Sequence, residues 1–241
     1  MPESVLDIQS ADSRRRPEPE PVPLDVLYED ECIIALNKPA GIVVHPTYRN
    51  TSGTLLNGLL WRLRGREGAQ PGIVTRLDKD TSGLVLVALS STIHATVQKS
   101  MTAIRKEYLA VVHGTPEPAR GTIALSLARD AGDRRRVVVT DGGAPCETRY
   151  EALDTPVRPG WSLVRCELVT GRTHQIRVHL AASGWPVVGD VVYGRADAEI
   201  KRQALHAWRV ALPHPVTGER VSVEAPLPAD FRALLPQNLT L

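Results

Sequence analysis

The sequence predicts an α+β protein built on a mostly antiparallel, mixed sheet with short flanking helices. Short apolar runs of strand character recur along the chain, and Gly, Pro, Asn and Asp residues separate them. A few segments instead space their apolar residues as helices do, and no internal repeat is evident. Many strands joined by tight turns, with few helices between them, favour an α+β arrangement.

The first elements lie in a domain that we expect at residues 25–235, after a disordered, proline-rich tail at residues 1–24. The tail mixes charges with prolines and has no core-forming run. Residues 32–36 form a short apolar run that ends at a turn over 37–41, which predicts a strand. Leucines at helical spacing predict a helix over 55–63.

The middle of the chain predicts a strand, a helix and a second strand. Residues 84–89 are all apolar, which is typical of a strand buried on both faces. Ser91 or Thr92 is placed to cap a helix, and residues 108–112 return to strand. The apolar face of the helix is formed by Ile93, Val97, Met101 and Ile104.

A hairpin is predicted where segments 135–140 and 147–153 flank Asp141-Gly142-Gly143, because this turn sequence is a strong hairpin signal. Residues 161–169 alternate apolar and polar positions, as a half-buried strand does.

A helix over 173–183, closed by Gly184, follows that strand. The last two strands are expected at 203–211 and 219–225, around the turn at 213–218.

The composition is that of a globular protein. Of 241 residues, 42% are hydrophobic and 23% are charged, which argues against disorder over most of the length. No apolar run approaches the roughly 20 residues that span a bilayer, and residues 1–20 do not resemble a signal peptide. We therefore expect a monomeric, cytoplasmic protein without a membrane partner. Cys32, Cys146 and Cys166 fit neither a disulfide framework nor a zinc pattern, so buried free thiols are expected.

The charge is close to neutral but unevenly distributed. A net charge of +2 is too small for a protein that coats nucleic acid. Basic residues nevertheless gather in four short segments, which leaves room for a local phosphate-binding face, although solvated surface arginines explain any single segment better. The segments contain Arg62, Arg64 and Arg66; Lys99, Arg105 and Lys106; Arg129, Arg134, Arg135 and Arg136; and Arg172 and Arg177.

Asp78 is the first candidate for chemistry. It lies in the polar, turn-forming segment 75–83, directly before the apolar strand, where a loop can hold a carboxylate at the mouth of a sheet. From the pattern alone, Asp78 is also a turn aspartate that binds backbone N–H groups. Asp80 is interpreted as a solvated or loop-fixing charge, and Tyr108 alone reads as a half-buried strand residue.

The segment 171–180 is the second candidate. If it is helical, Arg177 shares a face with Thr173 and His174. His174 and His179 are five residues apart, not the four of a helical zinc pair, and no carboxylate lies between them. No metal is predicted here.

Several blocks of sequence, taken in order, resemble the RluA-type pseudouridine synthases. Any one block is modest evidence, but the ordered set, from about residue 26 to 231, is highly specific. The blocks are Asn37-Lys38-Pro39-Ala40-Gly41 with Val44-His45-Pro46, Thr75-Arg76-Leu77-Asp78-Lys79-Asp80-Thr81-Ser82-Gly83-Leu84, Lys106-Glu107-Tyr108, Thr170 to His179, Val188 to Gly194, and Gln203-Ala204-Leu205-His206-Ala207.

The resemblance implies the pseudouridine synthase fold with a central catalytic cleft, and a role for each matching residue. Asp78 matches the catalytic aspartate, Tyr108 the tyrosine beneath the target base, and Arg177 the arginine that pairs with the aspartate and contacts phosphate. Arg76 matches the side chain that fills the space left by a flipped-out uridine. Further contacts to RNA are expected from Arg172, His174 and Gln175 and from a loop containing Arg129, Arg134, Arg135 and Arg136.

The implied reaction isomerises uridine to pseudouridine in ribosomal RNA or transfer RNA, and it requires no cofactor. It breaks the N1–C1′ bond and joins C5 to C1′, so no group is gained and no redox step occurs. Asp78 can act as a nucleophile or as the base that removes a ribose proton, and the sequence leaves both routes open. The alternatives are an RNA-binding or ribosome-assembly factor with vestigial catalysis, and a glycosidase, which usually needs two carboxylates.

The sequence departs from the family in two places. Thr75 stands where the family usually has histidine, and we interpret it as loop support. Many members carry an S4-type RNA-binding domain ahead of the catalytic domain, whereas only the short tail is found here. We therefore expect a compact member that binds structured RNA with its catalytic face.

Overall fold

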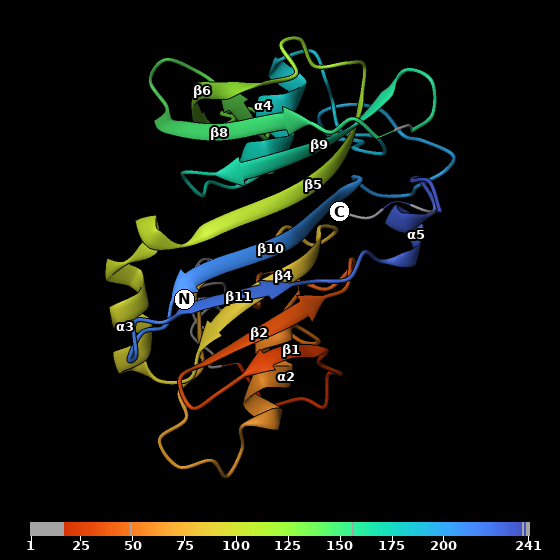
Figure 1. Ribbon diagram of the computed structural model, residues 1–241. Coiled ribbons are helices and arrows are strands. Elements are labelled where there is room, and N and C mark those ends of the chain that lie inside the picture. Colours follow the sequence, from red (N-terminus) through yellow and green to blue (C-terminus); the bar gives the residue numbers. More distant parts are fainter. Residues whose placement is uncertain (1–16, 49, 156, 238, 240–241) are drawn as a thin grey trace, which may run out of the picture.

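The computed structural model describes residues 17–48, 50–155, 157–237 and 239, and within them one mixed 11-stranded sheet forms the body of the protein (Figure 1). The strand order is β1-β2-β4-β10-β5-β9-β8-β6-β7, with β3 paired to β4 and β11 paired to β10. Of the described strand pairs, β10 and β4 are parallel and the others antiparallel. The predicted α+β class with a mostly antiparallel, mixed sheet is confirmed.

The elements between residues 26 and 103 form one side of the sheet and the helices beside it. The strands are β1 (Val26–Glu29), β2 (Ile33–Lys38), β3 (Gly72–Ile73) and β4 (Ser82–Ala88). The helices are α2 (Leu55–Arg62), α3 (Ser91–Lys99) and the 3-10 helix η1 (Met101–Ala103).

The remaining elements complete the sheet and its cover. The strands are β5 (Arg105–His113), β6 (Arg120–Arg129), β7 (Val137–Val139), β8 (Ala144–Ala152), β9 (Trp161–Leu168), β10 (Leu205–Pro213) and β11 (Arg220–Glu224). The helices are α4 (Gln175–Ala182) and α5 (Ala229–Arg232). None of the described helices is long and apolar enough to cross a membrane.

Strand β4 is apolar from Leu84 to Ala88 because this part of it separates two hydrophobic cores. Leu84 and Leu86 face the main core with β5 and β10, whereas Val85 and Val87 face the core beneath α2. Successive strand residues point to opposite faces, so a strand covered on both sides shows a continuous apolar run rather than an alternating one. Each such side chain contributes about 1.5–3 kcal/mol when fully buried.

Gly83, the second residue of β4 after the 75–81 loop, allows β4 to pair with β10. Its φ is +107°, and a Cβ there would lie 2.1 Å from the carbonyl oxygen of Ala207. Only glycine fits this approach. The loop before β4 is thereby fixed against the centre of the sheet.

The predicted hairpin around Asp141-Gly142-Gly143 is wrong. Strands β7 and β8 do not pair with each other, because both pair with β6 on its two edges: Leu127 faces Val139 on one side and Ala144 on the other. The turn crosses the end of β6, and a Cβ at Gly143 would lie 2.6 Å from the Leu127 backbone.

Two smaller expectations also differ. The cap of α3 is Ser90, whose Oγ accepts from the Ile93 N–H, rather than Ser91 or Thr92. Residues 1–16 of the expected tail lie outside the described residues, but residues 17–24 are ordered against α2, where Asn57 donates to the Glu18 carbonyl oxygen. Val22 and Leu24 pack on Gly58, which has no side chain to exclude them.

Candidate active site

A pocket of about 360 Å³ opens between the 75–81 loop, the start of β5 and the beginning of α4. Asp78, Tyr108 and Arg177, predicted as catalytic residues from three separate blocks, all line it. Asp78 is the only carboxylate among the described residues of the lining. A glycosidase usually needs two, so the pocket does not favour that alternative.

The loop that carries Asp78 is held by backbone contacts. The Thr81 N–H donates to the Asp78 carbonyl oxygen (3.1 Å), which closes a turn, and the Asp78 side chain is 22% exposed. The Thr75 hydroxyl accepts from the Leu86 N–H at 2.9 Å. Thr75 therefore supports the loop from the edge of β4, as predicted for this departure from the family pattern.

Lys38 fixes the other end of this loop. Its ammonium group is fully buried and donates to the carbonyl oxygens of Pro39, Ile42 and Lys79, at 2.7, 2.9 and 2.9 Å. Burial lowers the pKa of Lys38 to about 8, although the charge of Asp80 opposes the shift. Three carbonyl partners satisfy the three donors of the ammonium group, so Lys38 joins the 38–42 turn to the catalytic loop.

Arg177 joins the two sides of the pocket. Its Nη1 donates to Asp78 Oδ2 at 2.9 Å, and its Nε and Nη2 donate to the two oxygens of Asp190 at 2.7 and 2.8 Å. Burial opposes the charged form, but the hydrogen bonds and charge of Asp190, with the charge of Asp78, raise the pKa of Arg177. Arg177 therefore places a permanent cation directly against the Asp78 carboxylate.

Asp190 was missed as a site residue in the sequence. It is 1% exposed and also accepts from the N–H groups of Val192 and Tyr193, which fixes its orientation behind Arg177. Burial would raise the pKa of Asp190, but Arg177 holds it below its usual value. The signal was its place in the Val188–Gly194 block, but no local pattern shows which arginine it binds.

Tyr108 forms one wall of the pocket. It is 7% exposed on β5, and burial, followed by the nearby charge of Asp78, raises the pKa of its phenol. The ring is therefore neutral and offers a flat, apolar surface beside the carboxylate.

His174 also faces the carboxylate. Its Nε2 lies 3.9 Å from Asp78 Oδ1, and its Nδ1 lies 2.7 Å from the hydroxyl of Tyr193. Burial lowers the pKa of His174, while the charge of Asp78 opposes this. Tyr193, like Asp190, was not predicted from the sequence.

Gln175 is among the residues that line the pocket and is 2% exposed. Its Oε1 accepts from Thr170 Oγ1 and the Arg172 N–H, and its Nε2 donates to the Glu147 carbonyl oxygen and Thr148 Oγ1. With both ends of the amide in use, the geometry gives Gln175 a positioning role, which differs from the RNA contact that was expected.

Four cations surround the pocket: Arg76, Lys106, Arg129 and Arg172. No carboxylate of the described residues lies within ion-pair distance of any of them. Lys106 is half-buried, and burial lowers its pKa. The arrangement suits a polyanion that approaches the mouth of the pocket.

The predicted arginine loop connects β6 and β7 beside this rim. Arg134, Arg135 and Arg136 are exposed, and the Arg129 guanidinium donates to the Arg134 carbonyl oxygen at 2.7 Å. Arg135 pairs with Asp133 at 2.8 Å, so its charge is partly compensated. The loop thus adds charge to one side of the pocket, with Arg134 and Arg136 the better placed to bind an anion.

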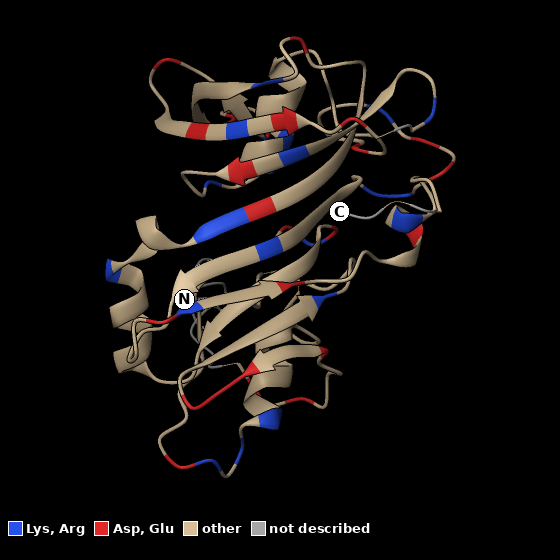
Figure 2. Cartoon of the chain, viewed as in Figure 1, with Lys and Arg blue, Asp and Glu red and all other residues tan. Residues whose placement is uncertain are grey.

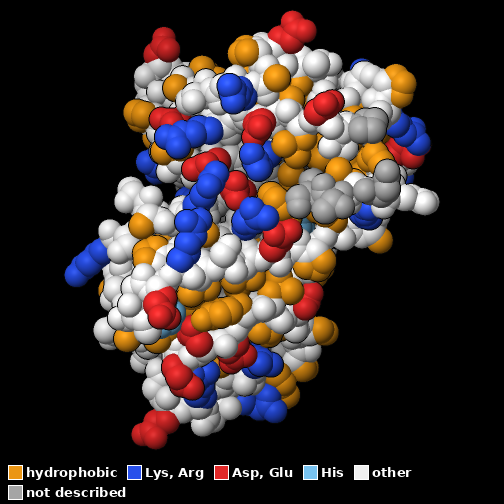
Figure 3. Space-filling view, in the orientation of Figure 1, with side chains coloured by type: hydrophobic (Ala, Val, Ile, Leu, Met, Phe, Trp, Pro, Cys, Tyr) orange, Lys and Arg blue, Asp and Glu red, His pale blue; other side chains and the backbone are white. Residues whose placement is uncertain are grey.

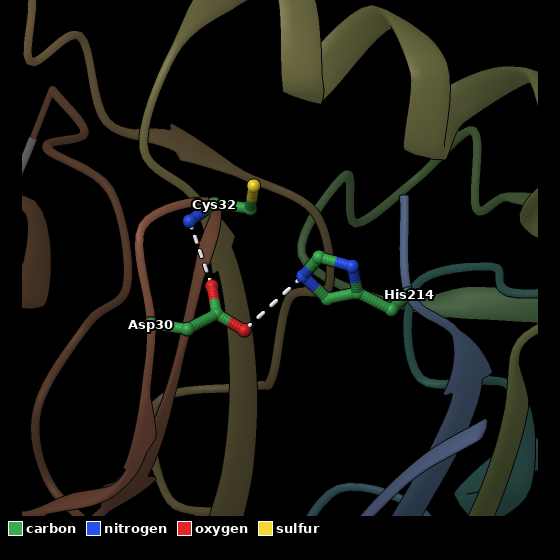
Figure 4. Close-up of side chains that lie close together, drawn as sticks. All are labelled: Asp30, Cys32 and His214. Carbon is green, nitrogen blue, oxygen red and sulfur yellow. Dashed lines mark hydrogen bonds and ion pairs between the residues drawn. The ribbon is translucent and has the colours of Figure 1, made fainter. Parts of the chain in front are cut away.

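Asp30, Cys32 and His214 form the one group of described residues whose side chains are close enough to share a metal ion. Figure 4 shows Asp30 between the other two, accepting from the Cys32 N–H at 2.7 Å and lying 3.2 Å from His214 Nε2. His214 Nδ1 accepts from two backbone N–H groups of the β10–β11 turn. The ring proton of neutral His214 therefore sits on Nε2 and points to Asp30, so this nitrogen is not free to coordinate. The group links two turns and does not fit a metal centre.

Comparisons with known proteins agree with this geometry. The family described as RNA pseudouridylate synthase matches residues 32–182. An uncharacterized RNA pseudouridine synthase, YlyB, of Bacillus subtilis (strain 168) is 43% identical over 227 residues, covering 91% of this chain and 74% of that protein. The ribosomal large subunit pseudouridine synthase D of Zymomonas mobilis subsp. mobilis is 40% identical and covers 90% and 73%. The solved structure of human RNA pseudouridylate synthase domain containing 1 superposes with a TM-score of 0.70 at 27% identity, covering 91% of this chain and 93% of that chain.

Proposed function

Because the chain belongs to the RluA-type RNA pseudouridylate synthase family and is an RNA pseudouridine synthase, we propose that Asp78 is the carboxylate on which its isomerisation of uridine depends. The observation that carries the proposal is the 2.9 Å contact from Arg177 to Asp78 inside a pocket that has no second carboxylate in its described lining. We assign the residues between 25 and 235 to the catalytic domain.

The chemistry needs each of the three proposed catalytic residues. Cleavage of N1–C1′ leaves the electron pair on uracil, C5 then bonds to C1′, the C5 proton leaves, and N1 takes up a proton. The Asp78 carboxylate serves either route, attack as a nucleophile or removal of a ribose proton, and Arg177 orients it through the 2.9 Å hydrogen bond. The neutral ring of Tyr108 supports the flat base while it turns.

The proposed substrate is large-subunit ribosomal RNA, because several relatives carry that substrate in their names. Arg76, at the exposed rim, is proposed to fill the space left by the flipped uridine, whose extrusion costs a few kcal/mol. Arg129, Arg172 and the 134–136 loop are proposed to bind phosphate. We further propose that the enzyme acts as a monomer in the cytoplasm.

Mapping of pseudouridine in a deletion strain tests the proposal. Ribosomal RNA from the deletion strain should lack at least one pseudouridine, which the wild-type gene restores and Asp78→Asn does not. Restoration by Asp78→Asn would refute the role of Asp78. A complete set of ribosomal sites in the deletion strain would refute the substrate, and transfer RNA mapped in parallel would identify the other substrate class.

A further inference from the structure

His174 has an unusual backbone. Its φ of 57° makes it the only residue other than glycine with a positive φ in the described part of the chain. This conformation costs of order 1 kcal/mol or more and persists where the surrounding structure fixes it, often at functional sites. Helix α4 begins at the next residue, but the His174 side chain makes no capping hydrogen bond. The conformation instead directs the ring into the pocket.

The contacts of Tyr193 determine which ring nitrogen of His174 carries the proton. The Tyr193 hydroxyl accepts from the Val137 N–H at 2.8 Å and lies 2.7 Å from His174 Nδ1. His174 Nδ1 is the one acceptor within hydrogen-bond distance of the hydroxyl hydrogen among the described residues, so we assign that hydrogen to Nδ1, which accepts it. In the neutral ring the proton is then on Nε2.

The Nε2–H group has no partner among the described residues. Its distance of 3.9 Å from Asp78 Oδ1 is too long for a hydrogen bond, and the other oxygen, Oδ2, is held by Arg177. The His174 side chain is 18% exposed and borders the same pocket as Asp78 and Tyr108. A donor with a fixed tautomer is thus aimed into the space beside the carboxylate.

We propose that His174 Nε2–H donates a hydrogen bond to a carbonyl oxygen of the flipped-out uracil, and that Tyr193 is the positioning residue that holds the ring in this tautomer. This inference rests on the proposed function, because it requires the target uridine to enter the pocket beside Asp78. When N1–C1′ breaks, the electron pair remains on uracil and its negative charge spreads onto O2 and O4. A fixed donor at either oxygen stabilises that charge more than it stabilises the uncharged base, and so accelerates the reaction.

A matched pair of substitutions tests the donor. His174→Gln places an amide N–H near the position of Nε2, whereas His174→Met has a similar length and the same backbone strain but no donor. We expect His174→Met to lower kcat/KM about 100-fold, mainly through kcat, and His174→Gln to retain at least about ten times the activity of His174→Met. Equal kcat/KM values for the two variants would overturn the proposal, because a purely structural role would affect both alike.

Thio-substituted RNA identifies the contact, since sulfur accepts hydrogen bonds weakly. One of two substitutions at the target position, 2-thiouridine or 4-thiouridine, should slow conversion by wild-type enzyme. His174→Met should lose this sensitivity to sulfur. If the His174 variants do not fold, Tyr193→Phe serves instead, because it leaves the backbone of His174 intact and should also reduce the sensitivity. Equal sensitivity in wild type and the variant would place His174 away from the base carbonyl groups.

The outcomes for this inference and for the proposed function are distinct. Failure of wild-type enzyme to convert uridine would contradict the proposed function. Normal conversion by wild type, together with equal rates for His174→Gln and His174→Met, would refute the role of His174 alone.

Discussion

The two faces of the sheet differ in how their charged side chains are paired. Figure 2 shows acidic and basic residues close together along β5, β8 and β9, and Figure 3 shows their side chains intermingled on the face in view. They form ion pairs along and across the strands: Arg105 with Glu107 and Glu167, Arg149 with Glu147 and Glu167, Arg165 with Glu151, and Arg209 with Glu107 and Glu224. We call this the paired face.

The opposite face contains the pocket. Tyr108 follows Glu107 along β5, and successive strand residues point to opposite faces, so the pocket lies across the sheet from the paired face. Its rim cations, Arg76, Lys106, Arg129 and Arg172, have no ion-pair partner in the described part of the chain. We call this the pocket face.

The comparison shows that the placement of charge, rather than its total, indicates the RNA-binding surface. Matched charges on the paired face cancel within a few ångströms and produce little field beyond the Debye length of about 8 Å. The pocket-face cations act together on an approaching phosphate chain. A net charge of +2 therefore conceals a strongly polarised molecule.

The largest expected effect is that of Asp78→Asn on the pocket face. We expect conversion of uridine to fall at least about 10³-fold, because the amide is neither a nucleophile nor a base. Asp80→Asn is the matched control: the same change in an exposed side chain two residues away should leave kcat within about twofold. The amount of pseudouridine formed in purified RNA distinguishes the two variants. Similar losses in both variants would contradict the assignment of Asp78.

Asp190→Asn should have the next largest effect. It removes the charge that compensates the buried guanidinium of Arg177, whose side chain is 5% exposed. We expect kcat to fall about 100-fold, and the free energy of unfolding to fall by about 3 kcal/mol because a buried charge loses its partner. Single-turnover rates and urea denaturation measure the two effects. A kcat equal to that of wild type would show that Arg177 does not need Asp190.

The stability of the sheet should depend on pH through a buried histidine rather than through the paired face. Burial lowers the pKa of His206 to about 4, from an ordinary value of 6.5. The folded state disfavours the protonated ring, so its stability is complete above pH 6.5 and falls by about 3 kcal/mol as the pH falls to 4. Urea denaturation against pH should show this loss, and His206→Asn should flatten the curve.

Other histidines contribute to that curve in the same direction. Burial also lowers the pKa values of His45, His113, His174 and His179, so part of the acid loss should remain in His206→Asn. An unchanged curve in His206→Asn would contradict the prediction for His206.

The smallest effect is expected on the paired face itself. Replacement of both Glu151 and Arg165 by alanine removes a partly exposed ion pair without leaving a lone charge. Such pairs contribute about 0–1 kcal/mol, so the free energy of unfolding should change by less than about 1 kcal/mol. Activity should stay within about twofold. A large loss of activity would show that this face contributes to the reaction.

Local sequence patterns predicted those helices and strands that can be recognised without knowing which segments they contact. The apolar run of β4 and the leucine spacing of α2 reflect their own burial and were found. Strand β6 was missed, because Gly121, Thr122 and Ser126 interrupt its alternation, and β7 and β8 were consequently paired with each other. Strand pairing depends on contacts distant in sequence, and a turn signal does not show what lies between two strands.

The residues of the site also divide into those that the sequence identified and those that only the structure shows. Asp78, Tyr108 and Arg177 were identified by motif, and they meet in one pocket. Asp190 and Tyr193 act by orienting Arg177 and His174 across 13 and 19 residues of sequence, and such pairings are tertiary. The assignment of Gln175 differed for the same reason, since its four hydrogen bonds arise only when the loop meets β8.

The salt dependence of RNA affinity tests the contrast between the two faces most directly. In the Asp78→Asn background, which prevents turnover, two variants that lose the same charge are compared: Arg129→Ala with Arg172→Ala on the pocket face, and Arg149→Ala with Arg165→Ala on the paired face. The slope of log Kd against log salt concentration should fall by about 1.4–1.8 for the pocket-face pair, since each phosphate contact accounts for about 0.7–0.9, and should not change for the paired-face pair. Equal slopes for the two variants, or a larger change for the paired face, would contradict the account.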